Sequence, residues 1–178
     1  MEATFEGLEV GSFGGLRSES IRKILVPVDG SSCSFEAIEY AINLAAKHNS
    51  EICLTFIVPT SVWNYYLMTE DWSPVLVCTM KEMEEEGERL LLSALTSVKE
   101  AGTRARAQLD YGHPADKITQ IAKEENSDLI VIGRSSRGFI ARWLYGSVSD
   151  EVVRKAPCPV LVVKERPQKN KHEEGCTT

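Results

Sequence analysis

The chain has 178 residues, 43% of them hydrophobic and 26% charged, which are ordinary values for one globular domain with a substantial core. Its formal net charge of −6 argues against a general nucleic-acid or anionic-membrane surface, because both need clustered basic side chains. There is no secretory signal, no apolar run of the roughly 18 residues that span a membrane, and no CxxC pair among five cysteines, so we expect a reduced, cytoplasmic protein without a zinc site.

Apolar runs alternate with helical periodicities along the chain. Short runs rich in β-branched residues predict strands, and apolar residues spaced three and four apart predict amphipathic helices. The predicted strands cover residues 21–28, 51–58, 104–109, 128–132 and 160–164. The predicted helices cover residues 35–48, 78–100, 115–125 and 147–155. Strands alternating with helices predict an α/β fold with a parallel sheet, right-handed crossovers and helices on both faces.

Three stretches lie outside this pattern. Residues 1–20 are rich in glycine and predict a flexible leader, whereas the polar residues 166–178 predict a disordered tail, which leaves one domain over 21–165. Residues 60–76 are rich in aromatics and have no clean period. They predict a loop partly buried against the core, or alternatively a lid or partner surface.

The stretch after the fourth strand has the features of an anion site. Gly133 ends the apolar run, a loop of small and basic residues that includes Arg134 follows, and Gly146-Ser147 begins the next helix. Loop glycines let backbone N–H groups approach a phosphate, and a helix N-terminus adds its positive dipole end. The sequence therefore predicts a nucleotide phosphate held by backbone. The Lys-Ser/Thr of a P-loop and the GxGxxG of a dinucleotide fold are both absent.

Residues 21–164 resemble the universal stress protein family, in particular its ATP-binding branch. The resemblance rests on three segments: KILVPVDGS, GHPADKITQIAKEENSDLIVIG and GSVSDEVVRKAPCPVLVV. It implies an α/β fold with a five-stranded parallel sheet of order 3-2-1-4-5, of the adenine nucleotide alpha hydrolase-like type. It also implies ATP, with Mg²⁺ or Mn²⁺ as a possible companion and AMP or ADP as alternative ligands, at the carboxyl edge of strands 1 and 4.

The resemblance also assigns site residues. It places the adenosine near Pro27, Val28 and Asp29, with Ile57 and Ile132 as apolar walls. It places the phosphates among Gly133, Ser136, Arg137, Gly138, Gly146, Ser147, Val148 and Ser149. Ser136 stands where the family's loop has its inner glycine, and we interpret it as a tolerated substitute whose hydroxyl could donate to phosphate. We expect Gly133→Val to abolish nucleotide binding while the fold survives.

The sequence leaves three functions open. The first is a regulatory protein that binds an adenine nucleotide in response to stress, forms a homodimer through its last strand, and is recognised by unidentified proteins. The second is a slow ATP hydrolase or phosphotransferase at the same site, and the third is an interaction module without nucleotide. The missing P-loop lysine and the lack of an evident general base favour the first. His113 is assigned to capping the helix that begins at Pro114, with no residue assigned to catalysis or to metal binding.

Overall fold

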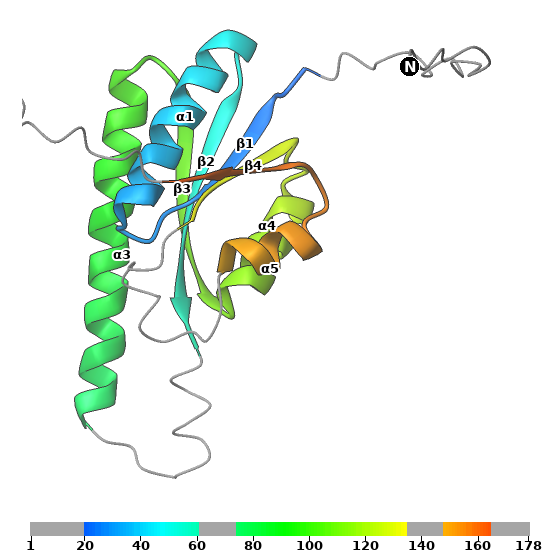
Figure 1. Ribbon diagram of the computed structural model, residues 1–178. Helices are drawn as coiled ribbons and strands as arrows, with labels where there is room; N and C mark the ends of the chain where they lie inside the picture. Colours follow the sequence, from blue (N-terminus) through cyan, green and yellow to red (C-terminus); the bar gives the residue numbers. More distant parts are fainter. Residues whose placement is uncertain (1–19, 61–73, 135–147, 165–178) are drawn as a thin grey trace, which may run out of the picture.

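A computed structural model describes residues 20–60, 74–134 and 148–164 of the chain, without the side chains of 74–77 and 79 (Figure 1). Five parallel strands form one sheet in the order β3-β2-β1-β4-β5, which confirms the predicted fold class. The strands are β1 (Lys23–Pro27), β2 (Glu51–Pro59), β3 (Arg104–Gly112), β4 (Leu129–Gly133) and β5 (Val160–Val163). The helices are α1 (Ser32–His48), α3 (Pro74–Glu100), α4 (Pro114–Glu124) and α5 (Val148–Lys155).

Helices cover both faces of the sheet, as the βα alternation predicts (Figure 1). Helices α1 and α3 pack on one face, where Phe56 and Leu54 of β2 are fully buried in the larger of two apolar clusters. Helices α4 and α5 pack on the other face, where the smaller cluster includes Leu25 and Ile130. Because the central strands are buried on both faces, they read in the sequence as continuous apolar runs. Within the described ranges, no helix is long and apolar enough to cross a membrane.

Asp128 explains where strand β1 begins. The sequence places Asp128 in the fourth strand and starts the first strand at residue 21. In the structure, Asp128 precedes β4 and its Oδ2 accepts hydrogen bonds from the backbone N–H groups of Arg22 and Lys23, at 2.7 and 2.9 Å. A side chain distant in sequence therefore satisfies donors at the start of β1.

Two other element ends differ from the sequence-based boundaries. Helix α3 begins at Pro74 rather than at residue 78, consistent with the preference of proline for the first helical turn. Strand β3 continues to Gly112 rather than ending at residue 109, because its backbone stays in register with β2 as far as Pro59. Its predicted edge position is confirmed.

Candidate functional site

The pairing of strands β1 and β4 stops short of their carboxyl ends. Strand β1 pairs with β2 at five positions, but with β4 only at Ile24–Leu129 and Leu25–Ile130. Pro27 has no N–H to donate to a ladder. Within the sheet, β2 lies next to β1 in one direction and β4 lies next to it in the other, so the strand order reverses at β1. Such a switch point, at the carboxyl ends of the strands, is where open α/β sheets bind their ligands.

The turn after β1 is shaped by Asp29. Its Oδ1 accepts hydrogen bonds from the Ser31 backbone N–H at 3.0 Å and from the Ser31 hydroxyl at 2.6 Å. Gly30 has a φ of +75°, a conformation that L side chains rarely adopt. Ser31 then caps α1, its Oγ accepting from the Ser34 N–H. Among the described residues, Asp29 Oδ2 has no hydrogen-bond partner, so one carboxylate oxygen remains able to accept.

Gly133 lets the start of α1 approach the end of β4. A Cβ placed on Gly133 would lie 2.5–2.7 Å from backbone atoms of Cys33 and Ser34. Real Cβ contacts essentially never come within 3.0 Å, so any side chain there would displace the α1 backbone. The expectation that Gly133→Val leaves the fold intact is therefore wrong. Gly133 is required for packing, and this contact brings the α1 N-terminus to the end of β4.

The apolar walls inferred from the family resemblance are core residues. Ile57 and Ile132 are 2% and 5% exposed and both belong to the apolar cluster beneath α4 and α5. Val28 is also buried, and its N–H donates to Thr55 O at 2.8 Å, while Pro27 is half-buried. Their burial is explained by core packing alone, whatever else they contact.

The first turn of α5 supplies the other described part of the phosphate region. Val148 packs against the cluster beneath α4 and α5, and Ser149 is 3% exposed, so an anion there would be held through backbone N–H groups. Asp150 and Glu151 lie in the same turn, and their carboxylates oppose an anion. The remaining predicted phosphate residues lie outside the described ranges: Ser136, Arg137, Gly138, Gly146 and Ser147.

His113 does not cap α4 through its side chain, which corrects the sequence-based assignment. It occupies the N-cap position, but its ring makes no hydrogen bond to the helix backbone. The ring instead faces two carboxylates, with Nδ1 3.4 Å from Asp116 Oδ2 and Nε2 3.9 Å from Glu151 Oε2. The spacing of His113 and Asp116 on one helical turn is visible in the sequence, whereas the approach of Glu151 from α5 is a tertiary contact.

Comparisons with known proteins agree on one family. The profile of the universal stress protein family matches residues 20–164. A universal stress protein of Methanocaldococcus jannaschii is 33% identical over 144 residues, covering 81% of this chain and 82% of that protein. A solved universal stress protein in complex with cAMP superposes with a TM-score of 0.58 at 24% identity, over 82% of this chain and 98% of that one. Another, from Archaeoglobus fulgidus in complex with dAMP, gives 0.59 at 22% identity, over 82% and 99%.

Proposed function

The chain belongs to the universal stress protein family, and from that premise we propose that it is a regulatory protein that binds an adenine nucleotide at the carboxyl ends of β1 and β4. The observation that carries this proposal is the end of the β1–β4 ladder after Leu25–Ile130. The helix N-terminus of α1 lies against β4 at this edge, at Gly133. The positive end of the α1 dipole is thus placed at the edge where an anion is expected to bind.

The ligands of the solved relatives support the choice of an adenine nucleotide. Both cAMP and dAMP consist of adenine, a pentose and one phosphate, and each is bound in a relative of this fold. We propose ATP as the ligand of this chain, with AMP and ADP as alternatives. Mg²⁺ or Mn²⁺ would assist by neutralising phosphate charge.

The proposed ligand is identified directly by the nucleotide that the protein retains. Mass spectrometry of the small molecules released on denaturation is expected to detect an adenine nucleotide. Titration calorimetry of the nucleotide-free full chain with ATP, ADP, AMP and cAMP then ranks them. No retained nucleotide, and no heat or thermal shift at millimolar concentration of any of the four, would contradict the proposal.

Asp29 offers a variant that tests the adenosine end without disturbing the turn. Asp29→Asn keeps an oxygen able to accept from Ser31 but removes the carboxylate charge and one acceptor. If Oδ2 accepts a hydrogen bond from the adenosine, affinity should fall about tenfold, which corresponds to roughly 1.4 kcal/mol. Asp110→Asn is the matched control, because Asp110 lies on edge strand β3, separated from β1 by β2. Equal affinities in the two variants would place the adenosine away from Asp29.

We propose that the protein is a homodimer that pairs through β5. Strand β5 lies at an edge of the sheet, where unpaired backbone groups favour pairing with another strand. Leu161 is 37% exposed, whereas Val162 packs against the cluster beneath α4 and α5. A two-fold contact would cover the same patch on both subunits. Light scattering that shows a monomer at high micromolar concentration would contradict this assembly.

A further inference from the structure

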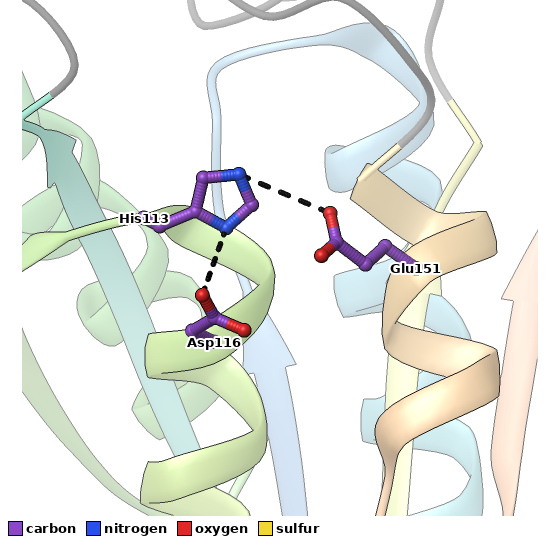
Figure 2. A group of neighbouring side chains, drawn as sticks. All are labelled: His113, Asp116 and Glu151. Carbon is purple, nitrogen blue, oxygen red and sulfur yellow. Dashed lines mark ion pairs between the residues drawn. The ribbon is translucent and has the colours of Figure 1, made fainter.

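A histidine and two carboxylates come together between helices α4 and α5, one carboxylate coming from the α5 turn that also borders the proposed phosphate region (Figure 2). His113 precedes α4, Asp116 is in its first turn, and Glu151 is in the first turn of α5. One ligand atom from each residue can be chosen so that all three lie within 4.8 Å of one another. Figure 2 shows the imidazole between the two carboxylates, each of which faces a different ring nitrogen.

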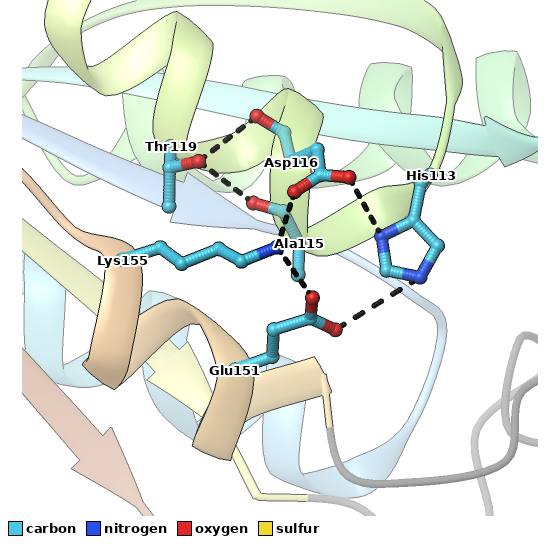
Figure 3. A network of polar contacts seen from close by, with 6 residues as sticks. All are labelled: His113, Ala115, Asp116, Thr119, Glu151 and Lys155. Carbon is cyan, nitrogen blue, oxygen red and sulfur yellow. Dashed lines mark hydrogen bonds and ion pairs between the residues drawn. The ribbon is translucent and has the colours of Figure 1, made fainter.

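Lys155 holds the two carboxylates from the other side. Its Nζ donates to Asp116 Oδ1 at 2.6 Å and to Glu151 Oε1 at 2.7 Å (Figure 3). The other two oxygens, Asp116 Oδ2 and Glu151 Oε2, are the ones that face the imidazole. The hydrogen bond from Lys155 lowers the pKa of the Asp116 carboxyl, so this group stays ionised at neutral pH. Lys155 therefore orients both carboxylates while leaving one oxygen of each toward His113.

Two carboxylate oxygens face the imidazole of His113, one at each ring nitrogen. A neutral imidazole has one N–H donor and one bare nitrogen, and both ring nitrogens of His113 face anionic oxygens. One of the two contacts then sets a lone pair against a carboxylate. His113 is 43% exposed, so a proton on the ring, an intervening water or a metal ion can relieve this contact.

We propose that His113, Asp116 and Glu151 bind a divalent transition metal of the Zn²⁺ class, with water completing the coordination. Imidazole nitrogen and carboxylate oxygen are both ligands of Zn²⁺, at about 2.0–2.2 Å, which places neighbouring ligand atoms of a tetrahedral site about 3.4 Å apart. Asp116 Oδ2 lies 3.4 Å from His113 Nδ1, whereas Glu151 Oε2 lies 3.9 Å from the other ring nitrogen, Nε2, and one metal ion binds only one of the two nitrogens. One ligand atom of each residue lies within 4.8 Å of the other two, so binding requires the side chains to turn toward one ring nitrogen. Lys155 then plays the outer role that hydrogen-bonded partners of ligating carboxylates have in known metal sites.

This inference does not depend on the proposed nucleotide, so it is tested in the absence of nucleotide. The full chain is treated with EDTA, dialysed and titrated with Zn²⁺ at pH 7.5, while NMR follows the imidazole signals of His113. We expect those signals to shift on Zn²⁺ addition, and His113→Asn and Glu151→Gln each to weaken Zn²⁺ binding at least about tenfold. His48→Asn is the matched control, because His48 is the last residue of α1 and does not belong to the cluster. This variant should bind Zn²⁺ as tightly as the wild type.

Two results would overturn the site. The first is an unchanged Zn²⁺ isotherm in both His113→Asn and Glu151→Gln, which would place any bound zinc elsewhere. The second is a set of His113 signals that titrate with pH but ignore Zn²⁺, which would mean that a proton alone satisfies the two carboxylates. All four side chains are exposed or half-exposed, so these variants are expected to fold, and circular dichroism checks this.

Discussion

The buried hydroxyl of Thr55 allows a test of how much an unpaired polar group lowers the stability of this core. Thr55 lies in the middle of β2, is 0% exposed, and its Oγ1 has no hydrogen-bond partner in the described part of the chain. An unsatisfied buried hydroxyl costs about 1–3 kcal/mol of stability. Thr55→Val replaces that hydroxyl with a methyl group of the same shape and also suits a buried strand. We therefore predict that the variant is more stable than wild type, by about 1–2 kcal/mol.

The measurement is the free energy of unfolding in urea, together with the melting temperature. For a domain of this size, each kcal/mol raises the melting temperature by about 2–4 °C. Thr55→Ser is the first control, because it keeps the hydroxyl and removes a buried methyl group, at a cost of about 1 kcal/mol. Thr119→Val is the second control, because the Thr119 hydroxyl lies 3.0 Å from Ala115 O and donates within α4. A Thr55→Val variant less stable than wild type by more than about 0.5 kcal/mol would refute the reasoning, since it would show that the hydroxyl has a partner.

Three further predictions concern packing, thiol reactivity and assembly. Gly133→Ala should lower stability, because its Cβ would meet the Cys33 backbone at 2.5 Å; a melting temperature equal to wild type would contradict this contact. Burial raises the pKa of the Cys53 thiol to about 11, so at pH 8 alkylation followed by peptide mapping should modify exposed Cys78 well before Cys53, and equal rates would be evidence against that burial. Leu161→Lys should weaken the proposed dimer by introducing like charges across the two-fold axis; an unchanged dissociation constant in analytical ultracentrifugation would move the interface away from β5.

Local pattern was sufficient for the existence and order of the elements. Strand β4 has four buried residues in succession, a pattern that a sheet covered on both faces produces and that is visible without coordinates. The sheet order itself came from the family resemblance, and the structure confirms it. The ends of the elements could not be predicted from local pattern, because contacts between residues far apart in the sequence set them. The bonds of Asp128 to Arg22 and Lys23 cross more than 100 positions of sequence, so no window around residue 21 contains them.

The candidate site likewise has some features that local sequence predicts and others that only tertiary contacts create. Asp29 and Gly30 were visible as a turn, and the structure shows that turn with its hydrogen bonds. The packing role of Gly133 was missed, because its neighbour is the backbone of α1, which leaves no signature in the residues beside the glycine. The grouping of His113 with Glu151 was missed for a related reason. The Lys155–Asp116 bond that fixes this region spans 39 positions between two helices.

The central place of β1 in the sheet has a consequence for synthesis on the ribosome. Strand β1 emerges first, and its neighbour β2 follows soon after, but its other neighbour β4 lies roughly 70 residues beyond β2. At translation rates of about 5–20 residues per second, one side of β1 waits on the order of 4–14 seconds for its partner. During that interval the nascent chain presents an unpaired strand edge bearing Ile24, Leu25 and Val26, all fully buried in the finished protein. We therefore expect the half-made sheet to be more prone to aggregate than the finished protein.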